Sequence, residues 1–127
     1  MDLESSISDL VGTKYKAHGR TKQEGLDCYG LVLLIGKRLG IELPESLYLA
    51  RWDKRHGLFE DNKQWFIRVE KPQAGDLITF SINKYVVHVG VMLDHYRFIH
   101  ATDTAGVCLG RVDSTPQTIE GYYRWKS

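Results

Sequence analysis

Apolar residues recur at helical spacing in the first forty residues of the chain. Near the N-terminus they share one helical face, at Leu3, Ile7, Leu10 and Val11. We expect this helix to be capped by Asp2 and to end at Gly12. A polar loop over residues 13–25 follows it.

The most apolar stretch, residues 26–40, predicts a second helix. Asp27 is a good N-cap, and Gly40 is suited to the position just after the helix end. Lys37 and Arg38 fall in the last turn, where positive charge suits the helix dipole. Because this helix is apolar on most sides, we expect it to be central and buried.

From Phe66 onward the pattern is typical of strands. Five runs predict strands after a turn at residues 72–75, and they cover 77–82, 85–93, 97–102, 107–112 and 121–125. A further short helix is expected over residues 57–65. Helices first and closely spaced strands afterwards predict an α+β fold with an antiparallel sheet of about five strands.

The composition is that of an ordinary globular domain. The chain has 127 residues, 43% of them hydrophobic and 26% charged, which predicts a single domain over residues 1–127. The net charge of +1 gives no electrostatic case for nucleic acid or an anionic membrane as a partner. The first residues lack the basic and apolar regions of a signal peptide, so we expect synthesis in the cytoplasm without one.

Cys28 is the first candidate for chemistry. It stands at the predicted start of the central helix, where the helix dipole stabilises a thiolate and unpaired N–H groups can bind an oxyanion. The neighbouring Asp27 opposes a low thiol pKa unless its charge is taken up in capping, so a histidine partner is expected. The only other cysteine, Cys108, lies in a strand-like run and is interpreted as structural.

Two histidines can supply that partner. His88 and His100 lie in consecutive predicted strands, and a three-residue loop at residues 94–96 would place both on one face of a hairpin. A two-residue turn would place them on opposite faces, but no Asn-Gly pair demands one.

This set of residues fits two kinds of site. One is a Cys–His–His triad in which His100 orients His88, the base. The other is a zinc site with Asp27 or Cys108 as the fourth ligand, although no close-spaced ligand pair is present.

Four segments together resemble the NlpC/P60 family of cysteine peptidases, in order and in spacing. They are Leu-Asp-Cys-Tyr-Gly-Leu-Val at 26–32, Pro-Gln-Ala-Gly-Asp-Leu-Ile-Thr-Phe at 72–80, His-Val-Gly-Val at 88–91 and Arg-Phe-Ile-His-Ala at 97–101. The resemblance implies a papain-like domain with Cys28 as nucleophile, His88 as general base and His100 as the third member. It also implies that no metal or cofactor is needed.

The resemblance assigns further residues to the substrate. Tyr15 matches a family tyrosine that lines the site and helps at the oxyanion, while Asp27 and Tyr29 occupy the segment that helps recognise the amino end of the substrate. Serine commonly follows the cysteine in the wall hydrolases of this family, whereas this chain has Tyr29.

The function implied is hydrolysis of the peptide stems of bacterial peptidoglycan, often between D-glutamate and a diamino acid. The form Asp-Cys-Tyr-Gly-Leu resembles the branch found in phage and prophage tail-assembly proteins, so tail proteins are expected partners and the tail would carry the enzyme to the wall. An antibacterial toxin delivered by a secretion machine, with an immunity protein, is an alternative. So are an inactive tail structural protein and an acyltransferase or deamidase with the same triad.

Overall fold

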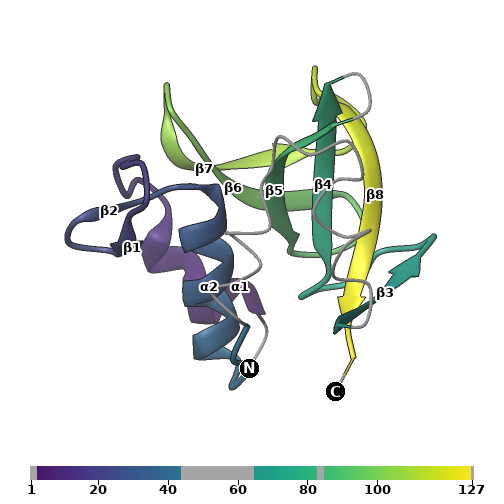
Figure 1. Ribbon diagram of the computed structural model, residues 1–127, viewed down its shortest axis with the longest axis horizontal. Coiled ribbons are helices and arrows are strands. Elements are labelled where there is room, and N and C mark those ends of the chain that lie inside the picture. Colours follow the sequence, from purple (N-terminus) through teal and green to yellow (C-terminus); the bar gives the residue numbers. More distant parts are fainter. Residues whose placement is uncertain (1–2, 44–64, 83–84, 127) are drawn as a thin grey trace.

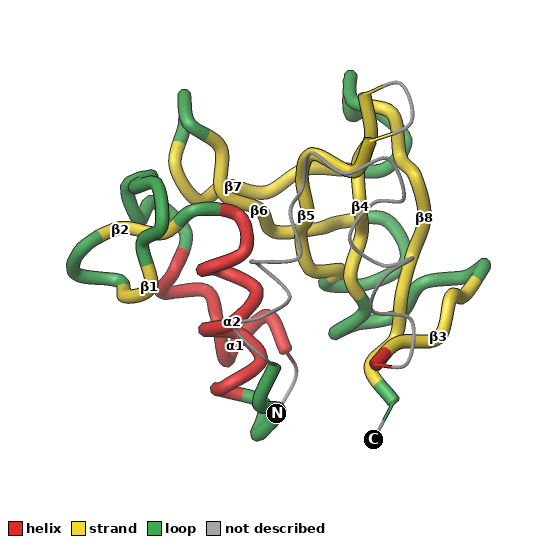
Figure 2. Tube along the Cα trace, viewed as in Figure 1, coloured by secondary structure: helices red, strands yellow, loops and turns green. Residues whose placement is uncertain are grey.

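The computed structural model describes residues 3–43, 65–82 and 85–126 and has two layers. The helical layer contains α1 (Leu3–Ile7), the short 3-10 helix η1 (Ser8–Leu10) and α2 (Cys28–Arg38). Figure 1 shows the helices on one side of a curved sheet, with the small hairpin of β1 (Arg20–Thr21) and β2 (Gly25–Leu26) beside α2. Figure 2 separates the helical and strand layers by colour and confirms the expected α+β class.

The sheet has six antiparallel strands within the described residues, in the order β3-β8-β4-β5-β6-β7. Their bounds are Phe66–Val69 for β3, Leu77–Ile82 for β4, Tyr85–Met92 for β5, Arg97–Thr102 for β6, Gly106–Arg111 for β7 and Thr118–Trp125 for β8. The expectation of about five strands missed β3, a four-residue edge strand that pairs with β8. Strand β8 also begins three residues earlier than expected, at Thr118.

The ends of α2 follow the capping signals in the sequence. Asp27 is the N-cap, and its side chain accepts a hydrogen bond from the backbone N–H of Gly30. Gly40 follows the C-cap with a φ of 80°, a left-handed conformation that glycine adopts without strain. The first predicted helix is shorter than expected, because it tightens into η1 at Ser8. The predicted cap Asp2 and residues 57–64 lie outside the described residues.

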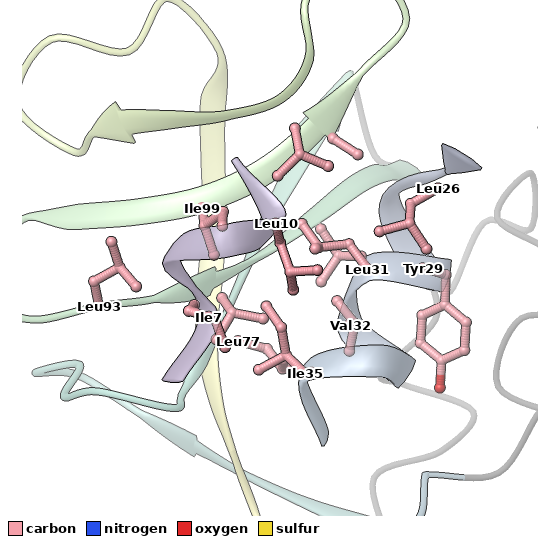
Figure 3. Packing of buried hydrophobic residues seen from close by; sticks show 14 of the residues in the cluster. Ile7, Leu10, Leu26, Tyr29, Leu31, Val32, Ile35, Leu77, Leu93 and Ile99 are labelled. Carbon is pink, nitrogen blue, oxygen red and sulfur yellow. The ribbon is translucent and has the colours of Figure 1, made fainter. Parts of the chain in front are cut away.

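One main core joins the two layers. Figure 3 shows Ile7, Leu10, Val32 and Ile35 from the helices meeting Leu77 and Ile99 from the sheet and Leu93 just after β5. Helix α2 packs on β5 and β6. The other face of the sheet carries a smaller cluster, whose fully buried members are Ile78, Phe80, Met92 and Phe98. The alternation along β5 and β6 therefore separates two apolar faces rather than an apolar and a polar one.

A buried carboxylate fixes the turn that leads into β4. Asp76 is 2% exposed and accepts hydrogen bonds from the Arg124 guanidinium of β8, with its two oxygens 2.9 and 2.8 Å from Nε and Nη2. The same carboxylate accepts a 2.9 Å hydrogen bond from the backbone N–H of Gln73. It thereby holds the turn at residues 72–75 against the neighbouring strand.

We expect Asp76→Ala to lower the free energy of unfolding by about 2 kcal/mol, because charge-assisted hydrogen bonds to a buried carboxylate are lost together. Urea denaturation would measure the change. The matched control is Asp113→Ala, which removes an exposed carboxylate paired with Arg111 and should have little effect. Equal losses in the two variants would contradict the role given to Asp76.

Candidate active site

The Asp27 carboxylate organises the start of α2. It is 3% exposed, and one oxygen accepts hydrogen bonds from Gly30 N at 2.7 Å and from Arg20 Nη1 at 3.1 Å. The other oxygen accepts a 2.8 Å hydrogen bond from His18 N. Asp27 thus links the helix start to the loop that precedes it, and its charge is matched by Arg20.

Gly30 allows that loop to approach the helix. A Cβ on Gly30 would lie 2.0 Å from the carbonyl oxygen of Gly19, closer than atoms can approach. Arg20 Nη1 donates a 2.9 Å hydrogen bond to the same carbonyl. The first turn of α2 is therefore locked between Asp27 and the 18–20 loop, with Cys28 as its first residue.

The Cys28 sulfur lies against β5. Burial, followed by the charge of Asp27, raises the pKa of the thiol to about 11, and backbone hydrogen bonds with Val89, Tyr29 and Cys28 itself offset only part of this rise. At neutral pH Cys28 is therefore a protonated thiol rather than a thiolate.

His88 and His100 are hydrogen-bonded to each other, with 2.8 Å between His88 Nε2 and His100 Nδ1. The register that pairs Val91 with Ile99 brings them onto one face, as the three-residue loop predicts. Gly90 leaves room for the pair, since a Cβ there would lie 3.1 Å from the Cβ of His100. A register shift in the β4–β5 pairing lies immediately beside His88.

Both histidines are largely buried among aromatic rings. The ring of Phe80 lies 5.4 Å from that of His88, and the ring of Phe98 lies 4.8 Å from that of His100. Burial, followed by the nearby His100, lowers the pKa of His88 to about 4, and burial lowers the pKa of His100 to about 4. Both imidazoles are neutral at pH 7, so each can supply one donor and one acceptor.

Cys28 and His88 line one pocket of about 210 Å³. Its other lining residues are Tyr15, Ala101, Thr102, Asp103 and Gln117. A second hollow of about 530 Å³ shares His88 and Gln117 with the first and is bordered by β4 and the start of β8. Thiol and imidazole thus lie together in one open depression.

The structure brings together four of the residues singled out in the sequence: Tyr15, Cys28, His88 and His100. Tyr15 is 37% exposed at the pocket, and burial followed by the nearby Cys28 and Asp27 raises the pKa of its phenol.

The structure buries Asp27 and Tyr29, the two residues that the resemblance assigns to recognition of the amino end of the substrate. Asp27 is buried and its oxygens are taken up by the cap, whereas Tyr29 is 0% exposed and belongs to the main core. Figure 3 shows the Tyr29 ring on the flank of α2, at the edge of that core. Residue 29 faces the core because the second position of α2 points away from the pocket, while the first carries the thiol.

Four residues of the site were not singled out from the sequence. Thr102, Asp103 and Gln117 line the pocket, and Arg20 pairs with Asp27. The position of Asp103, three residues after His100 and just beyond the end of β6, is a signal that could have found it. No comparable signal marks Gln117, because its place depends on how β7 and β8 are connected.

A model described as the NlpC/P60 family matches residues 12–120. The chain belongs to the NlpC/P60 family. The matched range contains Tyr15, Cys28, both histidines and Asp103.

Named relatives agree with this membership. The chain is 33% identical over 112 residues to a probable endopeptidase NlpC homologue of Haemophilus influenzae, covering 87% of this chain and 54% of that protein. It is 29% identical over 118 residues to the Escherichia coli K12 murein DD-endopeptidase MepS/murein LD-carboxypeptidase, covering 89% and 57%. The chain therefore spans about half the length of these curated relatives. The family and these names fit a cysteine peptidase.

A solved structure supports the fold of this NlpC/P60 domain. A Staphylococcus aureus Mu50 protein described as similar to lipoprotein, NLP/P60 family, superposes with a TM-score of 0.70 at 27% identity, covering 97% of this chain and 40% of that one.

The described part of the chain holds no set of ligands for the zinc site that the sequence left open. No three His, Cys, Asp or Glu side chains there are grouped so as to hold a metal ion. Cys108, one of its candidate ligands, pairs across β6 and β7 with His100 and remains a free thiol.

In the same described residues, no helix is long and apolar enough to cross a membrane.

The raised thiol pKa predicts a distinctive alkylation profile. In a Cys108→Ser background, the rate at which iodoacetamide modifies Cys28 should rise about tenfold per pH unit between pH 7 and 10, because thiolate is the reactive species. Mass spectrometry of quenched samples measures the rate. A rate that is already at its plateau at pH 7 would instead indicate a thiolate–imidazolium pair.

Proposed function

We propose that this NlpC/P60 domain is a cysteine peptidase that hydrolyses the peptide stems of bacterial peptidoglycan. The observation that carries the proposal is the His88–His100 hydrogen bond, combined with the place of His88 beside Cys28 in one pocket. A nucleophile, a base and a group that orients the base are the parts of a hydrolytic triad.

The tautomer of His88 follows from its partner. If His88 Nε2–H donates to His100 Nδ1, then His88 Nδ1 is unprotonated and can accept the thiol proton. His100 is then the positioning residue that selects this tautomer. Because thiol and imidazole are both neutral at rest, the proton moves as Cys28 attacks the carbonyl, and His88 next donates it to the leaving amine.

The oxyanion of the tetrahedral intermediate is stabilised at the start of α2. The first N–H groups of a helix lack partners within the helix, and the dipole favours negative charge there. The Tyr15 hydroxyl, on the pocket wall, is the second donor in this proposal. Water then hydrolyses the acyl-enzyme, with His88 acting as base.

For the bond cleaved, we propose the one between D-glutamate and the diamino acid of the stem. The Escherichia coli relative instead carries the names DD-endopeptidase and LD-carboxypeptidase, so defined muropeptides must include cross-linked dimers and tetrapeptides. The Asp27-Cys28-Tyr29 sequence supports delivery to the wall by a phage tail, with tail proteins as partners. Delivery by a secretion machine, with an immunity protein as partner, is the other route.

Cys28→Ala should reduce the release of new amines from these muropeptides by about 10³-fold or more, because it removes the nucleophile. Chromatography with mass spectrometry of the digest measures the products and separates hydrolysis from acyl transfer or deamidation. EDTA should leave the native enzyme active, as no step uses a metal. Undiminished activity in folded Cys28→Ala would contradict the mechanism, and an inactive native protein would favour a structural role in the tail.

Two substitutions at His100 test its positioning role. His100→Leu should lower kcat by at least about tenfold, because it removes the acceptor that holds the His88 tautomer. His100→Gln should retain more activity, since its side-chain carbonyl can accept the same hydrogen bond. Thermal unfolding of both variants controls for stability. Equal loss of kcat in two equally stable variants would show that packing, and not the hydrogen bond, is what His100 provides.

A further inference from the structure

Two carboxylates lie near the phenol of Tyr15, and they differ in whether they can bind a charged group of the substrate. Asp27 and Asp103 both act on the Tyr15 hydroxyl through their charges. Asp27 is buried and accepts hydrogen bonds from Gly30, His18 and Arg20. It therefore has neither the exposure nor the free acceptor capacity to bind a charged group of the substrate.

Asp103 is the opposite case. It is exposed and lines the same pocket as Cys28. Within residues 3–43, 65–82 and 85–126, no hydrogen bond or ion pair engages its carboxylate. Of the seven described residues that line the pocket, Asp103 alone has a side chain that is charged at neutral pH, because Cys28 and His88 are neutral there.

The turn that carries Asp103 is held in place. The Thr102 hydroxyl accepts a 3.0 Å hydrogen bond from the backbone N–H of Ala105. Just beyond the turn, Val107 O accepts from Gly12 N at 2.9 Å and Val107 N donates to Thr13 O at 2.8 Å. These bonds tie the Asp103 turn to the segment that leads to Tyr15, so the two walls of the pocket keep a fixed relation.

The geometry points to Asp103 as a subsite for a primary ammonium group of the substrate, beside the reacting carbonyl. This inference rests on the proposed peptidase function and adds to it the charge that the pocket selects. The ammonium can come from two sources: the free α-amine of a peptide, or the side-chain amine of a diamino acid. A neutral or anionic group in the same place would gain no ion pair and, if anionic, would be repelled.

The first test uses peptides that differ only in capping. One stem peptide has both amines free, a second is acetylated at the α-amine, and a third is acetylated at the side-chain amine. Asp103→Asn should lower kcat/KM about five- to tenfold only for peptides that retain the recognised amine, chiefly through KM. The peptide whose acetylation abolishes the effect of the substitution identifies which amine is bound.

The matched control is Glu70→Gln, which makes the same change of charge at an exposed residue beyond β3, on the far edge of the sheet. It should leave all three kcat/KM values unchanged. If Asp103→Asn lowers all three equally, or lowers none, the ammonium subsite is wrong.

A second test does not depend on peptidase activity. In a Cys108→Ser background, Cys28 is labelled at low salt with methanethiosulfonates that carry either a trimethylammonium or a sulfonate group. The ratio of the cationic to the anionic labelling rate should fall about fivefold or more in Asp103→Asn and should stay constant in Glu70→Gln.

The two tests distinguish failure of the inference from failure of the proposed function. A protein that cleaves no peptide, yet shows the Asp103-dependent labelling ratio, overturns the peptidase proposal and keeps a cation-selective pocket. A labelling ratio that ignores Asp103→Asn overturns the subsite whether or not peptides are cleaved.

Discussion

The arrangement of the site depends on one buried carboxylate, that of Asp27. Asp27 caps α2 through Gly30, pairs with Arg20 and accepts a hydrogen bond from the backbone of the preceding loop. Substituting an N-cap typically costs about 1 kcal/mol, but here the same group also sets the direction in which the first residue of the helix projects. Without it, the orientation of Cys28 toward β5 would have no local support. Arg20 limits the electrostatic penalty that Asp27 imposes on the thiol.

Burial is the second organising constraint, and it shifts the pKa of Cys28 and the pKa of His88 in opposite directions. It raises the pKa of Cys28 to about 11 and lowers the pKa of His88 to about 4, so the resting pair is uncharged. The same burial links the site to stability. As the pH falls from about 6.5, the unfolded chain protonates its histidines before the folded protein does. The contribution of the neutral histidine pair is therefore complete above pH 6.5 and declines toward pH 4.

The sequence indicates local features of this site well, because they depend on short-range rules. The cap at Asp27, the glycine after α2 and the common face of His88 and His100 all follow from capping preference or strand parity. Features that depend on contacts between distant segments were not accessible. The Asp27–Arg20 pair needs the path of the 13–25 loop, and Gln117 reaches the pocket only through the connection into β8. The burial of Tyr29 was likewise not accessible, because its position beside the cysteine does not say which way that face of the helix points.

The register around β4 explains why the histidines belong to an apolar face. His88 pairs with Phe80 across β4 and β5, and Phe98 lies two residues before His100 on β6. Aromatic rings on both sides exclude water from the imidazoles and limit the orientations they can adopt. These apolar surroundings thus orient the imidazoles, as the capped start of α2 orients Cys28.

The protonated state of Cys28 has a consequence outside the reaction itself. Peroxide oxidises thiolates, and conversion to sulfenic and then sulfinic acid follows the thiolate fraction and the exposure of the sulfur. A half-buried thiol that keeps its proton at neutral pH resists this chemistry. In the proposed mechanism, where the thiol gives up its proton only as it attacks, the resting sulfur is therefore also less open to oxidation.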